Sequence, residues 1–116
     1  MTRFGEVVEG SWMEGEAMWG MIAKVTAVAG RRGELVEILG RNARTMPGCL
    51  SYVVAEDAGD ESVTWVTEVW VDEGSHAGSL SLAAVQEAIR EAKPLVTGFE
   101  RIATTWPVAG VRGVDD

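Results

Sequence analysis

Two prolines, each following an amphipathic segment, constrain the fold of this sequence most strongly. Residues 34–46 carry a stripe of side chains at helical spacing and are followed by Pro47, and a second stripe begins near Leu82 and is followed by Pro94. A proline ring blocks continuation of a helix and disfavours helical geometry in the residue before it. We therefore expect two helices, each closed by a proline and followed by a strand. The expected buried stripes are Leu35, Ile38, Leu39, Asn42 and Met46, and Leu82, Val85, Ala88 and Ile89.

Four runs of alternating side chains predict β-strands. They lie in residues 18–30, 49–57, 62–70 and 96–108, and in the first of them Met21, Ala23, Val25 and Ala27 share one face. The intervening DAGDES at residues 57–62 has the Gly and Asp content of a hairpin turn, so the middle two strands should pair antiparallel. The predicted order β-α-β-β-α-β is that of a ferredoxin-like α+β fold, an antiparallel four-stranded sheet with both helices on one face.

Three regions follow from this reading. Residues 1–17 form an acidic N-terminal extension, residues 18–107 the ferredoxin-like domain, and residues 108–116 a C-terminal tail. With both helices on one face, the other face of the sheet would expose Trp and Val side chains, which is a larger apolar patch than a monomer usually carries. We therefore expect a homodimer that packs sheet against sheet.

Charge and composition exclude several classes of partner. The net charge of −8 would repel phosphate backbones and anionic lipid, so we expect neither a nucleic-acid partner nor a membrane partner. The sequence contains no apolar run long enough to span a bilayer and no basic start of a secretory signal. A single cysteine excludes an internal disulfide, and we expect a cytoplasmic protein.

Three short motifs in a fixed order resemble a known family. MPGCLSYVVAED at residues 46–57, EVW on the next strand and AKPLV after the second helix resemble the antibiotic biosynthesis monooxygenase domain family over residues 19–106. The resemblance implies a homodimer with a pocket in each subunit between sheet and helices. It also implies oxidation of a phenol, quinol or polyketide-like aromatic molecule by O2 without metal, flavin or another cofactor, although other members degrade haem or process small metabolites.

The resemblance also implies a set of site residues. Quinone-forming members place a Trp at the end of the third strand, matched here by Trp70, and an Arg on the second helix, matched by Arg90. Their pocket Tyr is replaced by His76, which could accept the phenolic proton, while Trp70 would form an apolar wall and donate a hydrogen bond to a ring oxygen. Arg90 would hold a phenolate or carboxylate. Apart from the resemblance, Glu68 would be costly to bury without a partner, so we expect this substrate-binding candidate either at the pocket mouth or paired across the dimer, with Arg101 or Lys24.

Departures from the family pattern leave a second function open. Val66, Ala55 and Ser79 stand where relatives often carry polar residues, and Ile89 replaces the helix His that ligates haem iron in haem-degrading members. The alternative to a monooxygenase is a non-catalytic dimeric module that binds a small molecule.

Each site residue also has a purely structural interpretation. Trp70 could be a core or interface residue, His76 could be merely exposed, and Arg90 could pair with Glu87 or Glu91 on the surface. Cys49 begins a strand directly after the Pro-Gly turn and lacks a catalytic partner motif, so we interpret it as a small buried apolar residue. Scattered carboxylates and one His provide no metal-ligand spacing.

Overall fold

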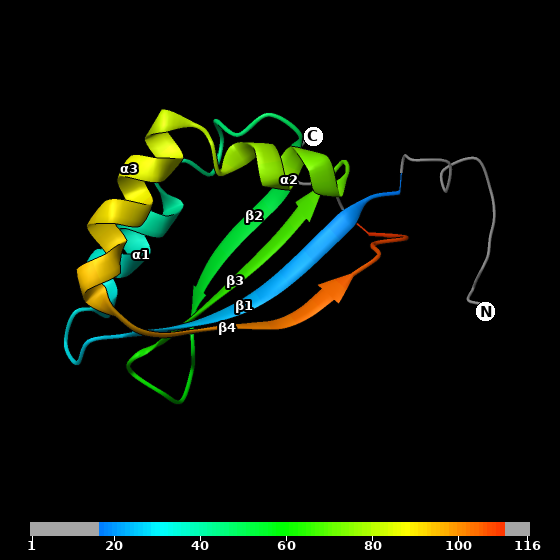
Figure 1. Ribbon diagram of the computed structural model, residues 1–116. Helices are drawn as coiled ribbons and strands as arrows, with labels where there is room; N and C mark the ends of the chain where they lie inside the picture. The colour runs from blue at the N-terminus through cyan, green and yellow to red at the C-terminus, as the bar shows by residue number, and fades with distance from the viewer. Residues whose placement is uncertain (1–16, 111–116) are drawn as a thin grey trace.

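The computed structural model describes residues 17–110, so the predicted N-terminal extension and most of the predicted tail lie outside the described residues. Its elements are β1 (Trp19–Ala27), α1 (Arg32–Gly40), β2 (Cys49–Glu56), β3 (Val63–Trp70), α2 (Glu73–Ser79), α3 (Ala83–Ala92), a 3-10 turn η3 (Lys93–Leu95) and β4 (Val96–Thr105). The strands form one antiparallel sheet in the order β2-β3-β1-β4, and the helices lie on one side of it (Figure 1). The predicted ferredoxin-like α+β fold is confirmed.

The first helix is shorter than predicted. Helix α1 ends at Gly40, and the chain continues to residue 46 through turns in which Ala43 N donates to Gly40 O and Thr45 N to Asn42 O. Glycine has a low helix propensity, which explains a helix end at this point. The prediction of a helix up to Pro47 is therefore wrong. The second predicted end is confirmed, because α3 stops at Ala92 and Pro94 lies in η3 before the next strand.

The small-residue segment before α3 is a helix, which adds one element to the predicted order. Asp72 caps α2 by accepting a hydrogen bond from Ser75 N at 2.7 Å, which satisfies one of the free N–H groups of the first turn. The observed order is thus β-α-β-β-α-α-β.

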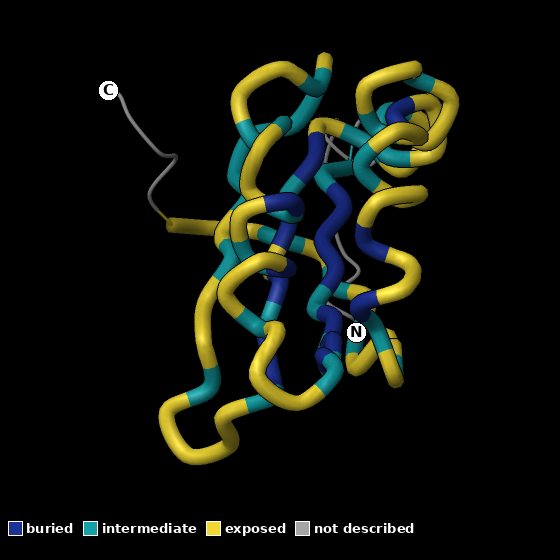
Figure 2. Tube along the Cα trace, turned by 90° about the vertical axis from the view of Figure 1, so that its left-hand side faces the viewer, coloured by how far each residue is buried: buried dark blue, intermediate teal, exposed yellow. Residues whose placement is uncertain are grey.

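The face of the sheet toward the helices is buried, which settles a point that alternation alone left open because both sets of β1 side chains are rather apolar. On β1 the buried residues include Met21, Ala23, Val25 and Ala27. Figure 2 shows buried residues along the centre of the molecule and exposed ones around its rim. Two buried clusters result: Val25, Ala27, Leu35, Ile38, Val66, Ala92 and Leu95 under α1 and α3, and Trp19, Met21, Ala23 and Trp70 nearer α2.

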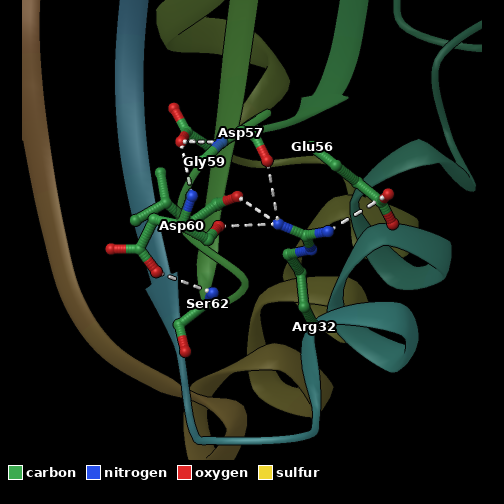
Figure 3. A network of polar contacts seen from close by, with 7 residues as sticks. Arg32, Glu56, Asp57, Gly59, Asp60 and Ser62 are labelled. Carbon is green, nitrogen blue, oxygen red and sulfur yellow. Dashed lines mark hydrogen bonds and ion pairs between the residues drawn. The ribbon is translucent and has the colours of Figure 1, made fainter.

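The β2–β3 hairpin is held by an arginine from α1 (Figure 3). Arg32 Nη1 donates to the backbone oxygens of Asp60 at 2.8 Å and Val63 at 3.2 Å, and Arg32 Nη2 lies 3.2 Å from Glu56 Oε1. Within the turn, Asp57 accepts from Trp65 Nε1 at 2.7 Å and from two backbone N–H groups, and these bonds lower the pKa of the Asp57 carboxyl. The predicted hairpin is therefore confirmed.

The turn before β2 brings the chain into contact with α2. Gly48 has a φ of 85°, a conformation that favours glycine, and its carbonyl accepts a hydrogen bond from Val71 N at 2.9 Å. A Cβ at Gly48 would lie only 2.6 Å from Ser75 Cβ. A glycine is thus required for this approach.

The other face of the sheet is not covered by any described helix (Figure 1). Val53, Trp65 and Val69 lie on this face, because along their strands they alternate with residues that face the helices. Of these three, Val53 is 52% exposed. This face is open, as the sequence predicts, and it carries these apolar residues together with polar ones such as Lys24 and Thr67.

Candidate active site

Two adjoining cavities lie between the sheet and the helices. The inner cavity, of about 300 Å³, reaches the end of β3 and α2, and the outer cavity, of about 430 Å³, lies under α1 and α3. Five side chains, which we call the collar, line both: Met46, Tyr52, Val85, Ile89 and Phe99. The inner cavity adds Met21, Glu68, Trp70, His76, Ser79, Leu80 and Arg101. The outer cavity adds Val25, Ile38, Leu39, Asn42, Ala88, Ala92, Lys93 and Val96.

The inner cavity brings an acid, an indole and an imidazole together. Glu68 and Trp70 are two residues apart on β3 and so point to the same side, where Trp70 Nε1 donates to Glu68 Oε1 at 2.8 Å. His76 Nε2 lies 3.9 Å from the same oxygen, which is within reach of charge attraction but too long for a hydrogen bond.

Aromatic rings fix the imidazole from two sides. The His76 ring stacks on Trp19 with centroids 4.6 Å apart and meets Trp70 edge-on at 5.4 Å. Register explains this grouping, because Trp19 is paired with Trp70 and Met21 with Glu68 across β1 and β3. Arg101 lies on β4, where it pairs with Ala23 of β1. Its guanidinium is 5.5 Å from the centre of the Trp19 ring, within cation–π range.

Burial and charge set the protonation of this group. Burial, aided by the positive charge of Arg101, lowers the pKa of His76 below its ordinary value of 6.5, so the imidazole is neutral at pH 7. Burial raises the pKa of Glu68, although the Trp70 hydrogen bond and Arg101 act in the opposite direction. The arrangement can therefore accept a proton at His76 and stabilise the resulting imidazolium with the Glu68 carboxylate.

Known sequences and structures resemble this chain across most of its length. The sequence profile of the family described as antibiotic biosynthesis monooxygenase matches residues 18–91. The chain belongs to the antibiotic biosynthesis monooxygenase family. This confirms the resemblance carried by the three motifs.

Solved structures agree with this assignment. A protein of Chloroflexus aurantiacus J-10-fl, described as a candidate antibiotic biosynthesis monooxygenase, is 47% identical with a TM-score of 0.79, over 82% of this chain and 97% of that one. One of Deinococcus radiodurans, described likewise, is 26% identical with a TM-score of 0.68, over 84% of this chain and 99% of that one. A Pseudomonas aeruginosa protein with 19% identity and a TM-score of 0.70, over 82% and 98%, shares the fold. No curated protein matches the chain.

The structure brings three of the four predicted site residues together. Trp70, His76 and Glu68 line the inner cavity, whereas Arg90 lies exposed on α3 and pairs with Glu87. Arg90 lines neither cavity, so the surface pairing that the sequence left open is the arrangement observed. The Trp70 N–H, which we expected to reach a ring oxygen of the substrate, donates to Glu68 instead.

The positions that depart from the family pattern have different surroundings. Ser79 lines the inner cavity and donates its hydroxyl to His76 O at 2.6 Å, Val66 is buried in the core, and Ala55 lies exposed on β2. Ile89, which we expected to be buried, is 51% exposed because it borders the cavities and is not covered by the packed core.

Cys49 has the surroundings of a structural residue. It packs against the Trp19 and Trp70 cluster, its thiol donates to Ser51 O at 3.6 Å, and burial raises its pKa, with Glu68 adding to the effect. A raised pKa keeps the sulfur as a thiol, which is a poor nucleophile.

Trp19, Tyr52 and Arg101 were assigned no catalytic or substrate-binding role from the sequence. Tyr52 and Arg101 line the inner cavity, and Trp19 stacks on His76. Trp19 continues the buried period of β1 by one step and could have been found by extending that alternation. Tyr52, whose pKa is raised by burial and by Glu68, lies within the MPGCLSYVVAED motif, but that motif marks only the family and gives the residue no role. Arg101 follows no simple alternation, because the β1–β4 register shifts between Ile22 and Ala23.

Two further findings concern the described residues only. Among residues 17–110, no group of three or more His, Cys, Asp or Glu side chains is arranged to hold a metal ion. No helix in the described chain is long and apolar enough to cross a membrane.

Proposed function

We propose that this protein is a monooxygenase that oxidises a phenolic, quinol or polyketide-like aromatic molecule with O2 and needs no metal, flavin or other cofactor. The observation that carries the proposal is His76, a partly buried imidazole that lies at the end of a largely apolar cavity, stacks on Trp19 and adjoins a carboxyl group. A base in this position can deprotonate a phenol at pH 7.

Each residue of the inner cavity has a separate task in this proposal. His76 takes the proton of the substrate, and Glu68 stabilises the imidazolium that forms. Trp70 is an apolar wall, and its N–H orients the Glu68 carboxylate without contacting the substrate. Arg101 takes the electrostatic task first expected of Arg90, because its guanidinium lines the cavity and can hold a substrate anion.

The reaction of an anthrone illustrates the balance of atoms and electrons. His76 removes a proton, and the ring anion transfers one electron to O2; the superoxide and the ring radical then combine into a C–O bond. The imidazolium returns its proton to the outer peroxide oxygen. Loss of water, with cleavage of the O–O bond and of the remaining C–H bond, leaves a carbonyl group. The net change is CH2 + O2 → C=O + H2O, and His76 is neutral again.

A homodimer is part of the same proposal. The open face carries Val53, Trp65 and Val69, and burying it against a second copy would remove this apolar surface from water. The pockets lie on the opposite face of the sheet, so such packing leaves both accessible.

Oxygen uptake over a panel of anthrones and hydroquinones, with a metal chelator present, tests the proposed activity. We expect one O2 consumed per anthrone and no released hydrogen peroxide. His76→Ala should lower kcat about a hundredfold or more while KM changes little, because general-base catalysis acts in the transition state. Wild-type protein that binds these molecules but consumes no O2 would instead identify a binding module.

A further inference from the structure

We propose that the substrate has two parts, an aromatic head that reacts in the inner cavity and an apolar extension that passes the collar into the outer cavity. This inference rests on the proposed function, since it deepens the description of the same site. It names the class of substrate as an aromatic ring system that carries an alkyl chain.

The first support is that the two cavities adjoin. The five collar side chains belong to both, so the cavities meet at a shared wall and not at opposite ends of the molecule. The inner cavity alone, at about 300 Å³, is at the small end of the range for ligand sites, and the outer cavity at about 430 Å³ is larger. A small phenol would leave this second space unused.

The second support is the segregation of chemistry between the cavities. The groups suited to the reaction, Glu68, His76 and Arg101, all line the inner cavity. The outer cavity is walled mainly by apolar side chains. Of its polar lining residues, Lys93 is exposed to solvent, and the Asn42 amide nitrogen already donates to Ala84 O at 3.2 Å. A ligand that matches both cavities is therefore polar at one end and apolar along the rest.

The third support is the exposure of the collar. Ile89 on α3 is 51% exposed and Phe99 on β4 is 60% exposed, although both border the cavities. Leaving such side chains in water is unfavourable, and an apolar extension lying between them would cover both. This places the extension along the opening between α3 and β4.

A homologous series of 2-alkyl-1,4-naphthohydroquinones, from methyl to hexyl, tests the inference. In the wild type, kcat/KM should rise about two- to fourfold with each added methylene, the gain expected from burying one such group, until the outer cavity is filled. A flat series would overturn the inference without any variant being needed.

Two variants locate the extension. Ala88→Phe and Asn42→Phe each add a ring to the wall of the outer cavity only, so both should abolish the gain in kcat/KM with chain length. The matched control is Ala83→Phe, the same change at an exposed position of α3 that lines neither cavity, and it should keep the full gain. Asn42 lies in a turn after α1, where added bulk disturbs less packing than within α3. Asn42→Phe therefore keeps the test usable if Ala88→Phe fails to fold. An unchanged gain in both folded variants would show that the extension lies elsewhere.

Binding of the corresponding quinones separates this inference from the proposed function. Quenching of Trp19 and Trp70 fluorescence reports binding without turnover, because both indoles flank His76. Chain-length-dependent affinity without O2 uptake would refute the monooxygenase and keep the two-part ligand. Turnover and affinity that are both independent of chain length would refute the two-part ligand and keep the monooxygenase.

Discussion

The hydrogen bond between Trp70 and Glu68 joins the wall of the inner cavity to its carboxyl group, and its strength can be measured by a double-mutant cycle. Trp70→Phe removes the donor to a buried carboxylate, which costs about 1.5–3 kcal/mol of unfolding free energy. The smaller ring at a position only 1% exposed leaves a void that adds about 1 kcal/mol. The single variant should therefore lose about 2.5–4 kcal/mol.

The second arm of the cycle uses Glu68→Gln, which keeps the acceptor oxygen but removes the charge. In that background the lost bond is neutral and worth about 0.5–1.5 kcal/mol, so Trp70→Phe should cost only about 1.5–2.5 kcal/mol. The expected coupling is about 1–1.5 kcal/mol, which exceeds the error of additivity for independent sites.

Urea denaturation followed by far-UV circular dichroism, at pH 8 and at one protein concentration, measures all four proteins. The pH is chosen to ionise Glu68. Burial raises the pKa of this carboxyl above its unfolded value, so ionisation is costlier in the native state and its destabilising contribution grows as the pH rises through the folded pKa. As the pH falls and the Glu68 carboxyl becomes protonated, the coupling should shrink, because a protonated carboxyl accepts a weaker bond. Strict additivity at pH 8, within about 0.3–0.5 kcal/mol, would refute the reasoning.

Four further outcomes are expected. The fall of kcat/KM on the acid side of its pH profile should lie below pH 6.5, because burial and Arg101 lower the pKa of His76. The same lowered pKa makes the fold lose stability as the pH falls through the pKa of the unfolded His. A fall of kcat/KM above pH 6.5 would contradict the lowered pKa and both of its consequences. Arg101→Leu should move that fall of kcat/KM to higher pH and weaken binding of an anionic substrate about tenfold or more, whereas the matched Arg90→Leu should do neither. Val53→Lys on the open face should convert a dimer into a 12.4 kDa monomer in sedimentation, while Ala77→Lys on α2 leaves the dimer intact, and a wild type that sediments as a monomer would exclude the dimer. Cys49→Ala should retain turnover in the oxygen assay, with a modest loss of stability, and a dead but folded variant would reveal a missed nucleophile.

The strands could be predicted well because one face of each central strand is buried. In β1 and β3 the period of two separates residues such as Val25 and Val66, which face the core, from residues such as Trp65. The hairpin and the end of α3 could be predicted equally well from the sequence, because Asp, Gly and Pro act through local backbone chemistry and need no distant contact.

The wrong predictions of helix bounds lie where the local sequence pattern does not determine the backbone structure. The helical stripe of the first segment continues through Asn42 and Met46, and both line cavities, yet the chain there follows successive turns that keep a similar spacing. Helix α2 is formed by seven mostly small residues and is held by the Asp72 cap, so its own propensity gives little signal.

The residues of the candidate site likewise divide into those that the sequence could predict and those that it could not. His76, Trp70 and Glu68 were found because the resemblance marks the end of β3. Arg101 was named only as a possible partner of Glu68. Its place in the cavity could not be predicted, because a register irregularity on an edge strand sets its position and such shifts leave no trace in alternation. For Arg90 the sequence offered a site and a surface pair with equal force, and only the contact with Glu87 distinguishes them.

The close approach of Gly48 to Ser75 affects how a mutational scan of this protein should be read. Gly48 precedes β2, whereas Ser75 adjoins His76 in α2, so a side chain at position 48 would push the imidazole away from Glu68 while the sheet remains paired. Such a variant would fold, lose activity and resemble the loss of a catalytic group. An inactive but folded substitution in the Pro-Gly turn therefore reports on the placement of α2, and it assigns no chemistry to the turn or to its neighbour Cys49.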